Sequence, residues 1–184
     1  GRVCVKQLYG PFAFAIYDSS TDELFLARDP LGERSICYGY SEEMFVFAST
    51  AKPVATLLGC TYDESFLETY AMLPFVPKSS NPYASPWEGV SYLGPGQTLV
   101  VREGDHQIET YWSYDKLSNE TESMKKDFYQ EFENILTNAT EACLAVEGEV
   151  GLQLSGGLDS TTVAAFAEPI LKKRGQVLHG YTHV

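Results

Sequence analysis

A run of six residues from Ser155 to Ser160, in the order Ser-Gly-Gly-Leu-Asp-Ser, carries the residue types that bind phosphate. Two adjacent glycines let the backbone approach a phosphate closely and adopt positive φ. The hydroxyls of Ser155 and Ser160 add hydrogen-bond donors. Asp159 would repel a bare phosphate, but its carboxylate can hold Mg²⁺, which proteins bind through one or two carboxylates together with phosphate oxygens. The run therefore predicts a site for phosphate and Mg²⁺.

The flanking residues predict the elements that position this run. Residues 150–154 are typical of a short buried strand, and residues from Leu158 onward are rich in Ala and aliphatic side chains, as in a helix. A helix start leaves its first N–H groups unpaired and carries partial positive charge, so an anion docks there. The usual P-loop has a Lys after its last glycine, and no Lys follows Gly157. The pattern therefore predicts a different kind of phosphate loop.

The six residues resemble the pyrophosphate loop of the ATP pyrophosphatase superfamily, whose members split ATP between its α- and β-phosphates and adenylate an acid or amide oxygen. A glycine turn that binds nothing is the alternative, but the strand before and the helix after favour the phosphate loop. The resemblance also implies adenine binding near His183, where a plain polar strand end is an equal alternative. The implied ATP-binding residues are Leu154, Ser155, Gly156, Gly157, Asp159, Ser160 and His183, with Asp159 on Mg²⁺.

The composition excludes several classes of function. The 184 residues carry a formal charge of −12, with 44% hydrophobic and 13% aromatic residues, as in a globular protein with an ordinary core. Binding to nucleic acid or to an anionic membrane depends on a surplus of Lys and Arg, so we expect neither partner. The four cysteines form no Cys-x-x-Cys pair, and no segment is typical of a signal peptide or membrane span. We therefore expect a cytoplasmic protein.

The first half of the sequence predicts antiparallel β-structure with helices inserted. Residues 12–18 and 23–28 are rich in β-formers and flank a turn, which indicates a hairpin. Ser49 or Thr50 can cap a helix that Gly59 ends. Further strands are expected at residues 3–5, 35–40 and 44–48, and a hairpin is expected within residues 88–112. The expected helices are residues 52–58 and 63–72.

The second half predicts a strand, helix and strand unit preceded by another helix. Residues 124–146 carry apolar side chains at three- and four-residue spacing, and we expect this helix to pack on the strand at 150–154. The helix after the phosphate loop should run to Arg174, with Pro169 kinking or interrupting it. Residues 177–182 predict a second, parallel strand. Such a unit is typical of a doubly wound α/β sheet that binds nucleotide at the carboxyl ends of its strands.

The resemblance widens in the first half. Residues 10–18, 26–32 and 47–49 are similar to the later half of a class II glutamine amidotransferase domain, and residues 88–102 are similar to a further run of that family. Followed by the phosphate loop, this order resembles glutamine-hydrolysing asparagine synthetase and its relatives. The resemblance implies an α+β part at residues 1–114, a linker at 115–123, and the start of an α/β doubly wound parallel-sheet nucleotide-binding domain at 124–184.

The resemblance implies an ATP-dependent amide ligase that adenylates a carboxylate, aspartate in the family, and transfers ammonia from glutamine, releasing AMP and pyrophosphate. Small-molecule substrates and a homodimer of the full-length enzyme are expected. Asparagine-forming members carry Gly-x-Lys-Pro-Leu-Tyr where residues 32–38 here read Gly-Glu-Arg-Ser-Ile-Cys-Tyr, so the acceptor stays open. An intramolecular ligase of the β-lactam synthetase or lasso-peptide cyclase type, with a degenerate glutaminase half, is one alternative. A non-catalytic nucleotide-binding module is another.

The residues with which the family hydrolyses glutamine are not recognised in this sequence. The family uses an N-terminal Cys as nucleophile, and Cys4 lacks the glycine that closely follows it there. We therefore interpret Cys4 as a packing residue and predict no catalytic residue of the glutaminase within the chain. The chain is expected to be a central fragment, inactive by itself.

Overall fold

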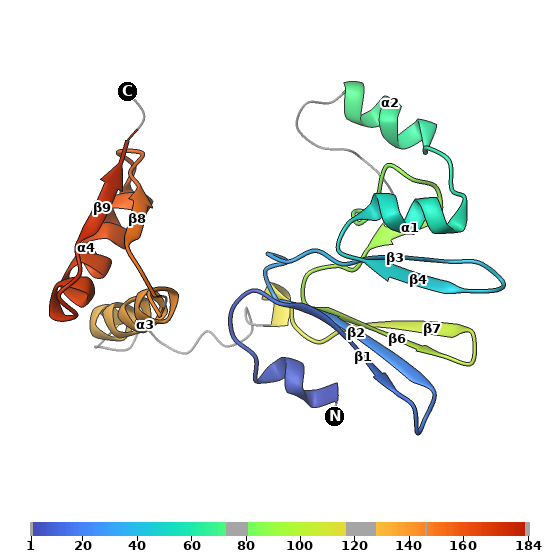
Figure 1. The fold of residues 1–184 in the computed structure, drawn as a ribbon, viewed down its shortest axis with the longest axis horizontal. Helices are drawn as coiled ribbons and strands as arrows, with labels where there is room; N and C mark the ends of the chain where they lie inside the picture. Colours follow the sequence, from blue (N-terminus) through green and yellow to red (C-terminus); the bar gives the residue numbers. More distant parts are fainter. Residues whose placement is uncertain (1, 73–80, 117–127, 146, 183–184) are drawn as a thin grey trace. The chain divides into compact units, whose positions relative to one another are not determined.

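A computed structural model describes residues 2–72, 81–116, 128–145 and 147–182 (Figure 1). The chain divides into two compact units, Gly1–Glu120 and Thr121–Val184, which are described separately. The predicted domain limits at 114 and 124 stay predictions, since the residues between 117 and 127 lie outside the described part. Within the described residues, no helix combines the length and the apolar character needed to cross a bilayer.

The first unit contains the antiparallel β-structure that its sequence predicts, divided between two sheets. One has the strand order β1-β2-β6-β7, formed by β1 (Ala13–Asp18), β2 (Glu23–Arg28), β6 (Gln97–Arg102) and β7 (Asp105–Thr110). The other has the order β4-β3-β5, formed by β4 (Phe45–Ala48), β3 (Cys37–Tyr40) and β5 (Val90–Tyr92). The expected hairpin is confirmed, with Ala13 opposite Arg28 and Asp18 opposite Glu23.

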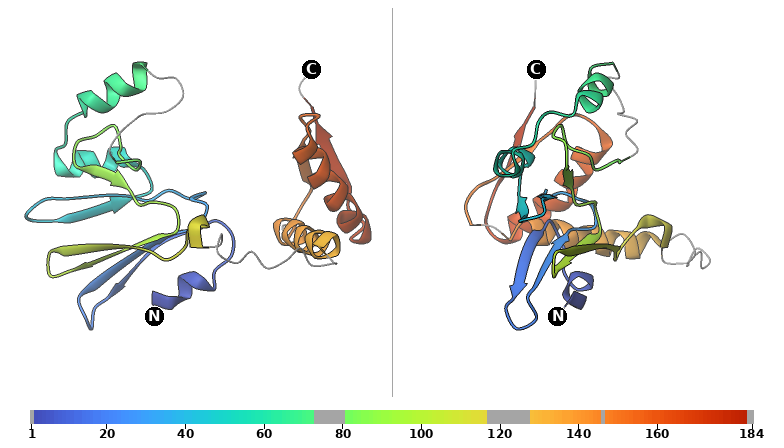
Figure 2. Two further views of the ribbon diagram at one scale, coloured as in Figure 1. Left: turned by 180° about the vertical axis from the view of Figure 1, so that it is seen from behind. Right: turned by 90° about the vertical axis from the view of Figure 1, so that its right-hand side faces the viewer.

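The core of the first unit lies between these sheets, whose β3–β4 and β2–β6 layers face one another (Figures 1 and 2). Alternation along β2 sends Leu24 and Leu26 into this core, while Phe25 and Ala27 face the opposite side. Leu26 and Leu99, which pair across β2 and β6, are fully buried. The buried core residues are Leu26, Ile36, Tyr38, Leu93 and Leu99.

Helix α1 (Ala51–Leu58) covers the outer face of the β4-β3-β5 sheet, where Val54 and Ala55 pack with Cys37 and Val90. A Cβ atom on Gly39 would meet the Leu58 side chain at 2.7 Å and the Gly89 carbonyl oxygen at 3.0 Å, so a larger residue at this position would require both neighbours to shift. Gly59 ends the helix with φ 68°. Helix α2 (Glu64–Met72) begins after Asp63, whose carboxylate accepts the Phe66 N–H at 2.9 Å.

The expected strand at residues 3–5 is wrong, because Arg2–Lys6 forms a 3₁₀ helix, η1. Val5 is buried against Phe25 and Ala27, whereas Val3 is 68% exposed, so the two valines do not share a buried face as strand residues would. The N–H of Gln7 donates to the carbonyl of Cys4 at 2.9 Å and closes the turn. Tertiary packing of one side chain has overridden the local β propensity.

The second unit contains the predicted parallel pair, β8 (Val150–Gln153) and β9 (Leu178–Tyr181), with Val150 beside Leu178. Helix α4 (Leu158–Lys173) connects them and packs on one face of the pair. Its C-terminus is closed by Gly175, with φ 70°, and by the Gln176 N–H, which donates to the Leu171 carbonyl at 2.9 Å. The buried residues are Leu144, Ala167, Ile170 and Leu171, with Val150 and Leu178 against them.

Two expectations for the second unit are corrected. Helix α3 (Phe128–Cys143) packs mainly on α4 and leaves Phe132 and Ile135 52% and 62% exposed, while Leu144, directly after its end, belongs to the cluster against which Val150 and Leu178 of the strand pair pack. The apolar spacing identified the helix but not the partner of its apolar face. Helix α4 is not interrupted at Pro169. Proline removes one helical hydrogen bond, and the burial of the neighbouring Ile170 and Leu171 offsets that loss.

Candidate functional site

The predicted phosphate run forms the connection between the carboxyl end of β8 and the start of α4. The Leu154 N–H donates to the Tyr181 carbonyl at 2.6 Å, which ties the loop to the end of β9. Gly156 has φ +77°, a left-handed conformation that favours glycine, and a Cβ atom there would meet nothing within 4 Å. The turn therefore places Gly156 at an open surface where a ligand can approach the backbone.

The start of α4 presents N–H groups without an acceptor. Gly157 is the N-cap residue and provides no side-chain cap. Thr161 is the first residue of the helix whose N–H bonds back, to the Gly157 carbonyl at 3.3 Å. Within the described part of the chain, the N–H groups of residues 158–160 therefore have no partner, as expected for the first turn of a helix. Together with the helix dipole they form a cradle for an anion.

The two serine hydroxyls close the loop on itself. The hydroxyl oxygens of Ser155 and Ser160 lie 3.1 Å apart, and the Ser155 N–H donates to the Ser160 hydroxyl at 3.2 Å. The Gly157 N–H donates to the Ser155 hydroxyl at 3.3 Å, and the Ser160 hydroxyl donates to the Gly157 carbonyl at 3.3 Å. These bonds hold the turn in a form ready for a ligand, because a phosphate oxygen can replace one acceptor without unfolding the turn.

Asp159 lies in the first turn of α4 and is exposed. Among the described residues, no group of three His, Cys, Asp or Glu side chains is arranged to hold a metal ion. A single carboxylate beside a phosphate cradle nevertheless fits Mg²⁺, which takes one or two protein carboxylates and completes its shell with phosphate oxygens and water. His183 lies outside the described residues, and its adenine contact stays a prediction.

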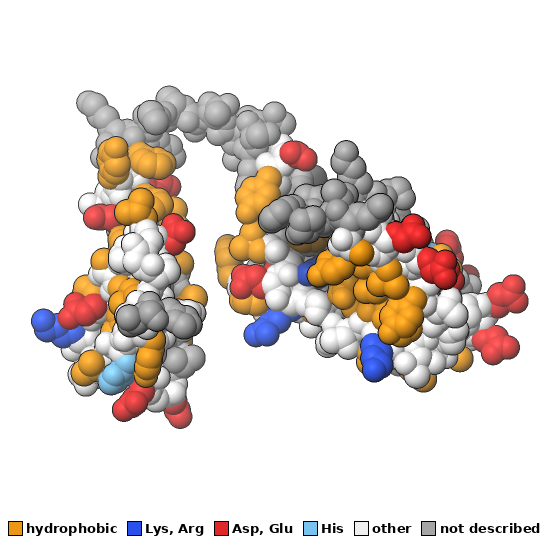
Figure 3. Space-filling view, turned by 90° about the horizontal axis from the view of Figure 1, so that it is seen from above, with side chains coloured by type: hydrophobic (Ala, Val, Ile, Leu, Met, Phe, Trp, Pro, Cys, Tyr) orange, Lys and Arg blue, Asp and Glu red, His pale blue; other side chains and the backbone are white. Residues whose placement is uncertain are grey.

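Attraction for a polyanion must come from this local cradle. The chain has a formal charge of −12, and acidic side chains are more frequent than basic ones on the face in Figure 3. A diffuse negative charge of this kind repels a nucleotide at long range. Partial positive charge at a helix start acts only within about the first turn, so any attraction of the loop for an anion would act at contact distance.

In the first unit, the turn after β2 also places an aspartate, Asp29, beside several backbone N–H groups. Asp29 is 1% exposed, and its carboxylate accepts the N–H groups of Leu31, Glu33 and Arg34 at 3.0–3.1 Å. Burial favours the neutral acid, but the hydrogen bonds from Arg34, Glu33 and other backbone N–H groups outweigh it and lower the pKa of Asp29. The backbone N–H groups of residues 29 and 31–34 are all bonded within the protein, so Asp29 maintains the fold.

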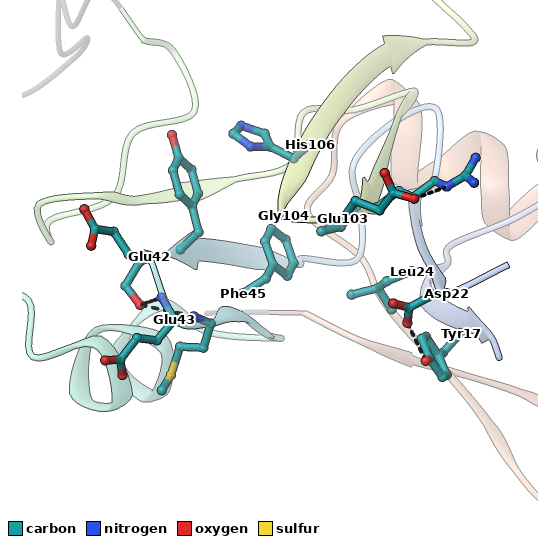
Figure 4. A pocket seen from close by; sticks show the side chains of 14 residues that line it. Tyr17, Asp22, Leu24, Glu42, Glu43, Phe45, Glu103, Gly104 and His106 are labelled. Carbon is teal, nitrogen blue, oxygen red and sulfur yellow. Dashed lines mark hydrogen bonds and ion pairs between the residues drawn. The ribbon is translucent and has the colours of Figure 1, made fainter.

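A cavity separate from the loop between β8 and α4 opens in the first unit, where turns of its two sheets meet (Figure 4). It measures about 580 Å³ and has Leu24 and Phe45 among its apolar lining and several carboxylates around them. The Tyr17 hydroxyl donates to Asp22 at 2.7 Å, which raises the pKa of Tyr17, and the rings of Tyr40 and His106 lie 4.5 Å apart. Sequence reasoning missed this cavity because its residues come from three separate turns. It contains none of the predicted site residues.

The described cysteines of the first unit, Cys4, Cys37 and Cys60, all pack in hydrophobic clusters. Cys4 packs against the cluster of Val5, Phe25 and Ala27, as predicted. Cys37 is fully buried, and burial raises the pKa of its thiol to about 11. A thiol with that pKa stays protonated at neutral pH and is a poor nucleophile.

Comparison with known proteins gives each unit its class. The family described as glutamine amidotransferase domain matches residues 1–112, and the family described as asparagine synthase matches residues 131–183. The chain belongs to the asparagine synthase-like family, in which an amidotransferase domain precedes an asparagine synthase domain.

Individual relatives agree with this assignment. The putative glutamine-hydrolysing asparagine synthetase 2 of Methanocaldococcus jannaschii is 29% identical over 167 residues, which cover 89% of this chain and 32% of that protein. The glutamine-hydrolysing asparagine synthetase 3 of Bacillus subtilis is 29% identical over 183 residues, which cover 97% of this chain and 29% of that protein. The chain thus spans about a third of the length of the curated relatives it matches.

Proposed function

We propose that the natural gene product carrying this chain is an ATP-dependent amide ligase, which adenylates a carboxylate and transfers ammonia derived from glutamine. The loop between β8 and α4 carries the proposal, because three adjacent N–H groups that have no acceptor among the described residues lie beside an open, glycine-containing turn. The names of the relatives support aspartate as the carboxylate and glutamine as the source of nitrogen.

The proposed reaction has two chemical steps. An oxygen of the acceptor carboxylate attacks the α-phosphorus of ATP, the bond from that phosphorus to the bridging oxygen breaks, and pyrophosphate leaves with the bonding electrons. Ammonia then attacks the acyl carbon, loses a proton and displaces AMP. The N–H groups of Leu158, Asp159 and Ser160 stabilise the charge that develops on the leaving pyrophosphate.

The residues of the loop have distinct proposed roles. Asp159 would hold a Mg²⁺ ion, which would supply further charge stabilisation for the leaving pyrophosphate. The Ser155 and Ser160 hydroxyls, now bonded to each other, donate to phosphate oxygens. The glycines allow the phosphates to approach the backbone. The complete proposed ATP site is Leu154, Ser155, Gly156, Gly157, Asp159, Ser160 and His183.

Glutamine hydrolysis is assigned to residues outside these 184. The described cysteines of the first unit include a packed Cys4 and a Cys37 whose thiol stays protonated, and neither suits nucleophilic attack. The relatives are about three times as long as this chain, and the proposal places the nucleophile in a part of them that the chain does not span.

The proposal is tested by exchange of labelled pyrophosphate into ATP, measured on the natural gene product with aspartate present. Asp159→Asn should lower the exchange rate by roughly 10²–10³-fold, the effect of removing one preorganised electrostatic group. Glu168→Gln is the matched control, because Glu168 is an exposed acid on the same helix away from the loop. Wild-type exchange in the Asp159→Asn variant would remove the proposed role of Mg²⁺. Absence of exchange in the wild type with any added carboxylate would remove the ligase assignment.

A further inference from the structure

The carbonyl group of Gly157 accepts three hydrogen bonds. The Ser160 hydroxyl and the Thr161 N–H each donate to it at 3.3 Å, and the Thr161 hydroxyl lies at 3.0 Å. The side-chain bond from Thr161 is the shortest of the three. The same hydroxyl lies 3.1 Å from the Leu158 carbonyl, so it is directed at the junction between loop and helix.

The peptide that contains this carbonyl also contains a free donor of the anion cradle. In a trans peptide the C=O of one residue and the N–H of the next lie in one plane and point in opposite directions. The described part of the chain contains no cis peptide, so the Gly157 carbonyl and the Leu158 N–H are coupled in this way. A group that holds the carbonyl therefore also aims the Leu158 N–H at the open side of the loop.

The three bonds respond differently to a ligand, if the loop binds ATP as proposed above. The Ser160 hydroxyl would donate to a phosphate oxygen in place of the Gly157 carbonyl, so it would no longer hold that carbonyl. The backbone bond from Thr161 is long and lies at the end of the helix, where bonds open readily. The Thr161 hydroxyl is then the remaining side-chain group that fixes the orientation of the Gly157–Leu158 peptide.

We propose that Thr161 is a positioning residue of the phosphate loop, which acts on the nucleotide through the Gly157–Leu158 peptide without touching it. Threonines within helices often bond back to a carbonyl four residues earlier, with little consequence for ligands. Here the bonded peptide lies at the N-cap and its N–H is free for a ligand. That location distinguishes Thr161 from Thr162, whose hydroxyl forms no hydrogen bond with the described residues.

Four variants of the natural gene product test this role by calorimetric titration with Mg²⁺-pyrophosphate and with Mg²⁺-ATP. Thr161→Val keeps the β-branched shape and removes the hydroxyl, so both dissociation constants should rise about threefold to tenfold, the range expected for one neutral hydrogen bond. Thr161→Ala should weaken binding as much, although Ala favours the helix. Thr161→Ser restores the hydroxyl and should bind within about twofold of wild type. Thr162→Val is the matched control and should also bind as wild type.

Thermal unfolding of the same variants separates positioning from stability. Thr161 is exposed and Thr162 is half-buried, and Val keeps the shape of Thr, so all the variants should fold and the loss of affinity should not follow the midpoint of unfolding. Wild-type affinity in Thr161→Val, equal weakening in Thr161→Val and Thr162→Val, or failure of Thr161→Ser to restore binding would each overturn the role of Thr161. A wild-type protein that binds neither pyrophosphate nor ATP would overturn the proposed function itself, and this inference with it.

Discussion

Two aspartates in tight turns, Asp29 and Asp159, show how differently the two units use the same residue type. Asp29 is buried and accepts three backbone N–H groups of its own turn. Asp159 is exposed, and the N–H groups around it have no acceptor among the described residues. The first arrangement satisfies every donor and therefore stabilises the fold. The second leaves donors free and therefore suits a ligand.

The same contrast holds for the cores of the two units. The first unit packs η1, two sheets and α1 in successive layers, with Leu26 and Leu99 fully buried between the sheets. The second unit buries one small cluster on one face of a two-stranded sheet, and α3 leaves Phe128, Phe132 and Ile135 more than half exposed. Burial thus concentrates in the unit that lacks the phosphate loop.

The largest effect should come from truncating a core side chain of the first unit. Leu26→Ala should destabilise that unit by about 3 kcal/mol, because it removes buried methyl groups and leaves a cavity. Ile135→Ala should change the stability of the second unit by at most about 0.5 kcal/mol, since this side chain is 62% exposed. Hydrogen exchange of the natural gene product, read separately in each unit, measures both. A large cost for Ile135→Ala would show that this side chain is buried in the natural protein and would break the contrast.

A smaller effect is expected within the phosphate loop. Gly156→Ala should cost about 1–2 kcal/mol, because φ +77° is a left-handed conformation that side chains with a Cβ disfavour, although the space there is open. Gly157→Ala should cost less, since φ is −81° and the new Cβ would lie 3.4 Å from the Ser155 hydroxyl, an ordinary contact. Chemical denaturation and pyrophosphate titration of both variants give the comparison. Equal costs at the two glycines would contradict the described turn.

The smallest effect should be a difference between Cys37 and Cys143 in their rates of reaction with a thiol reagent. Burial raises the pKa of Cys37 from 9.0 to about 11, whereas Cys143 of α3 is exposed. A thiol reagent at pH 8, followed by mass spectrometry, should modify Cys143 and spare Cys37. The folded state holds its Cys37 proton more tightly than the unfolded state, so this group's contribution to stability is present below pH 9 and falls as the pH rises towards 11. Rapid labelling of Cys37 at pH 8 would show that the first unit opens readily.

Local sequence patterns predicted the elements of the fold well where the pattern itself sets the structure. Alternating β-formers around a turn at residues 19–22 predicted β1 and β2, and Gly59 marked the end of α1. The Ser155–Ser160 run predicted the loop between β8 and α4, because its glycines and flanking apolar segments permit few other structures. The order of the two halves was also sufficient to indicate the family.

Features that depend on contacts between distant residues were not predicted. The 3₁₀ helix at residues 2–6 follows from the burial of Val5 under β2, which no local pattern reveals. The apolar stripe of α3 indicated a helix but not that its partner would be α4. The role proposed for Thr161 depends on which hydroxyl lies within hydrogen-bond distance of the Gly157 carbonyl, which a sequence does not give. The position of Thr161 directly after the phosphate run was nevertheless a signal that sequence reasoning could have used.

The glycine at position 39 has a consequence for how this sequence can diverge. The gap between α1 and the sheet beneath it is set by a missing side chain, with the Leu58 methyl and the Gly89 carbonyl occupying the room a Cβ would need. Mutational drift at 39 is therefore coupled to position 58 and to the backbone at 89. In homologous chains that keep this spacing between α1 and the sheet, the residue types at positions 39, 58 and 89 should change together. Residues with exposed side chains on either sheet can change independently.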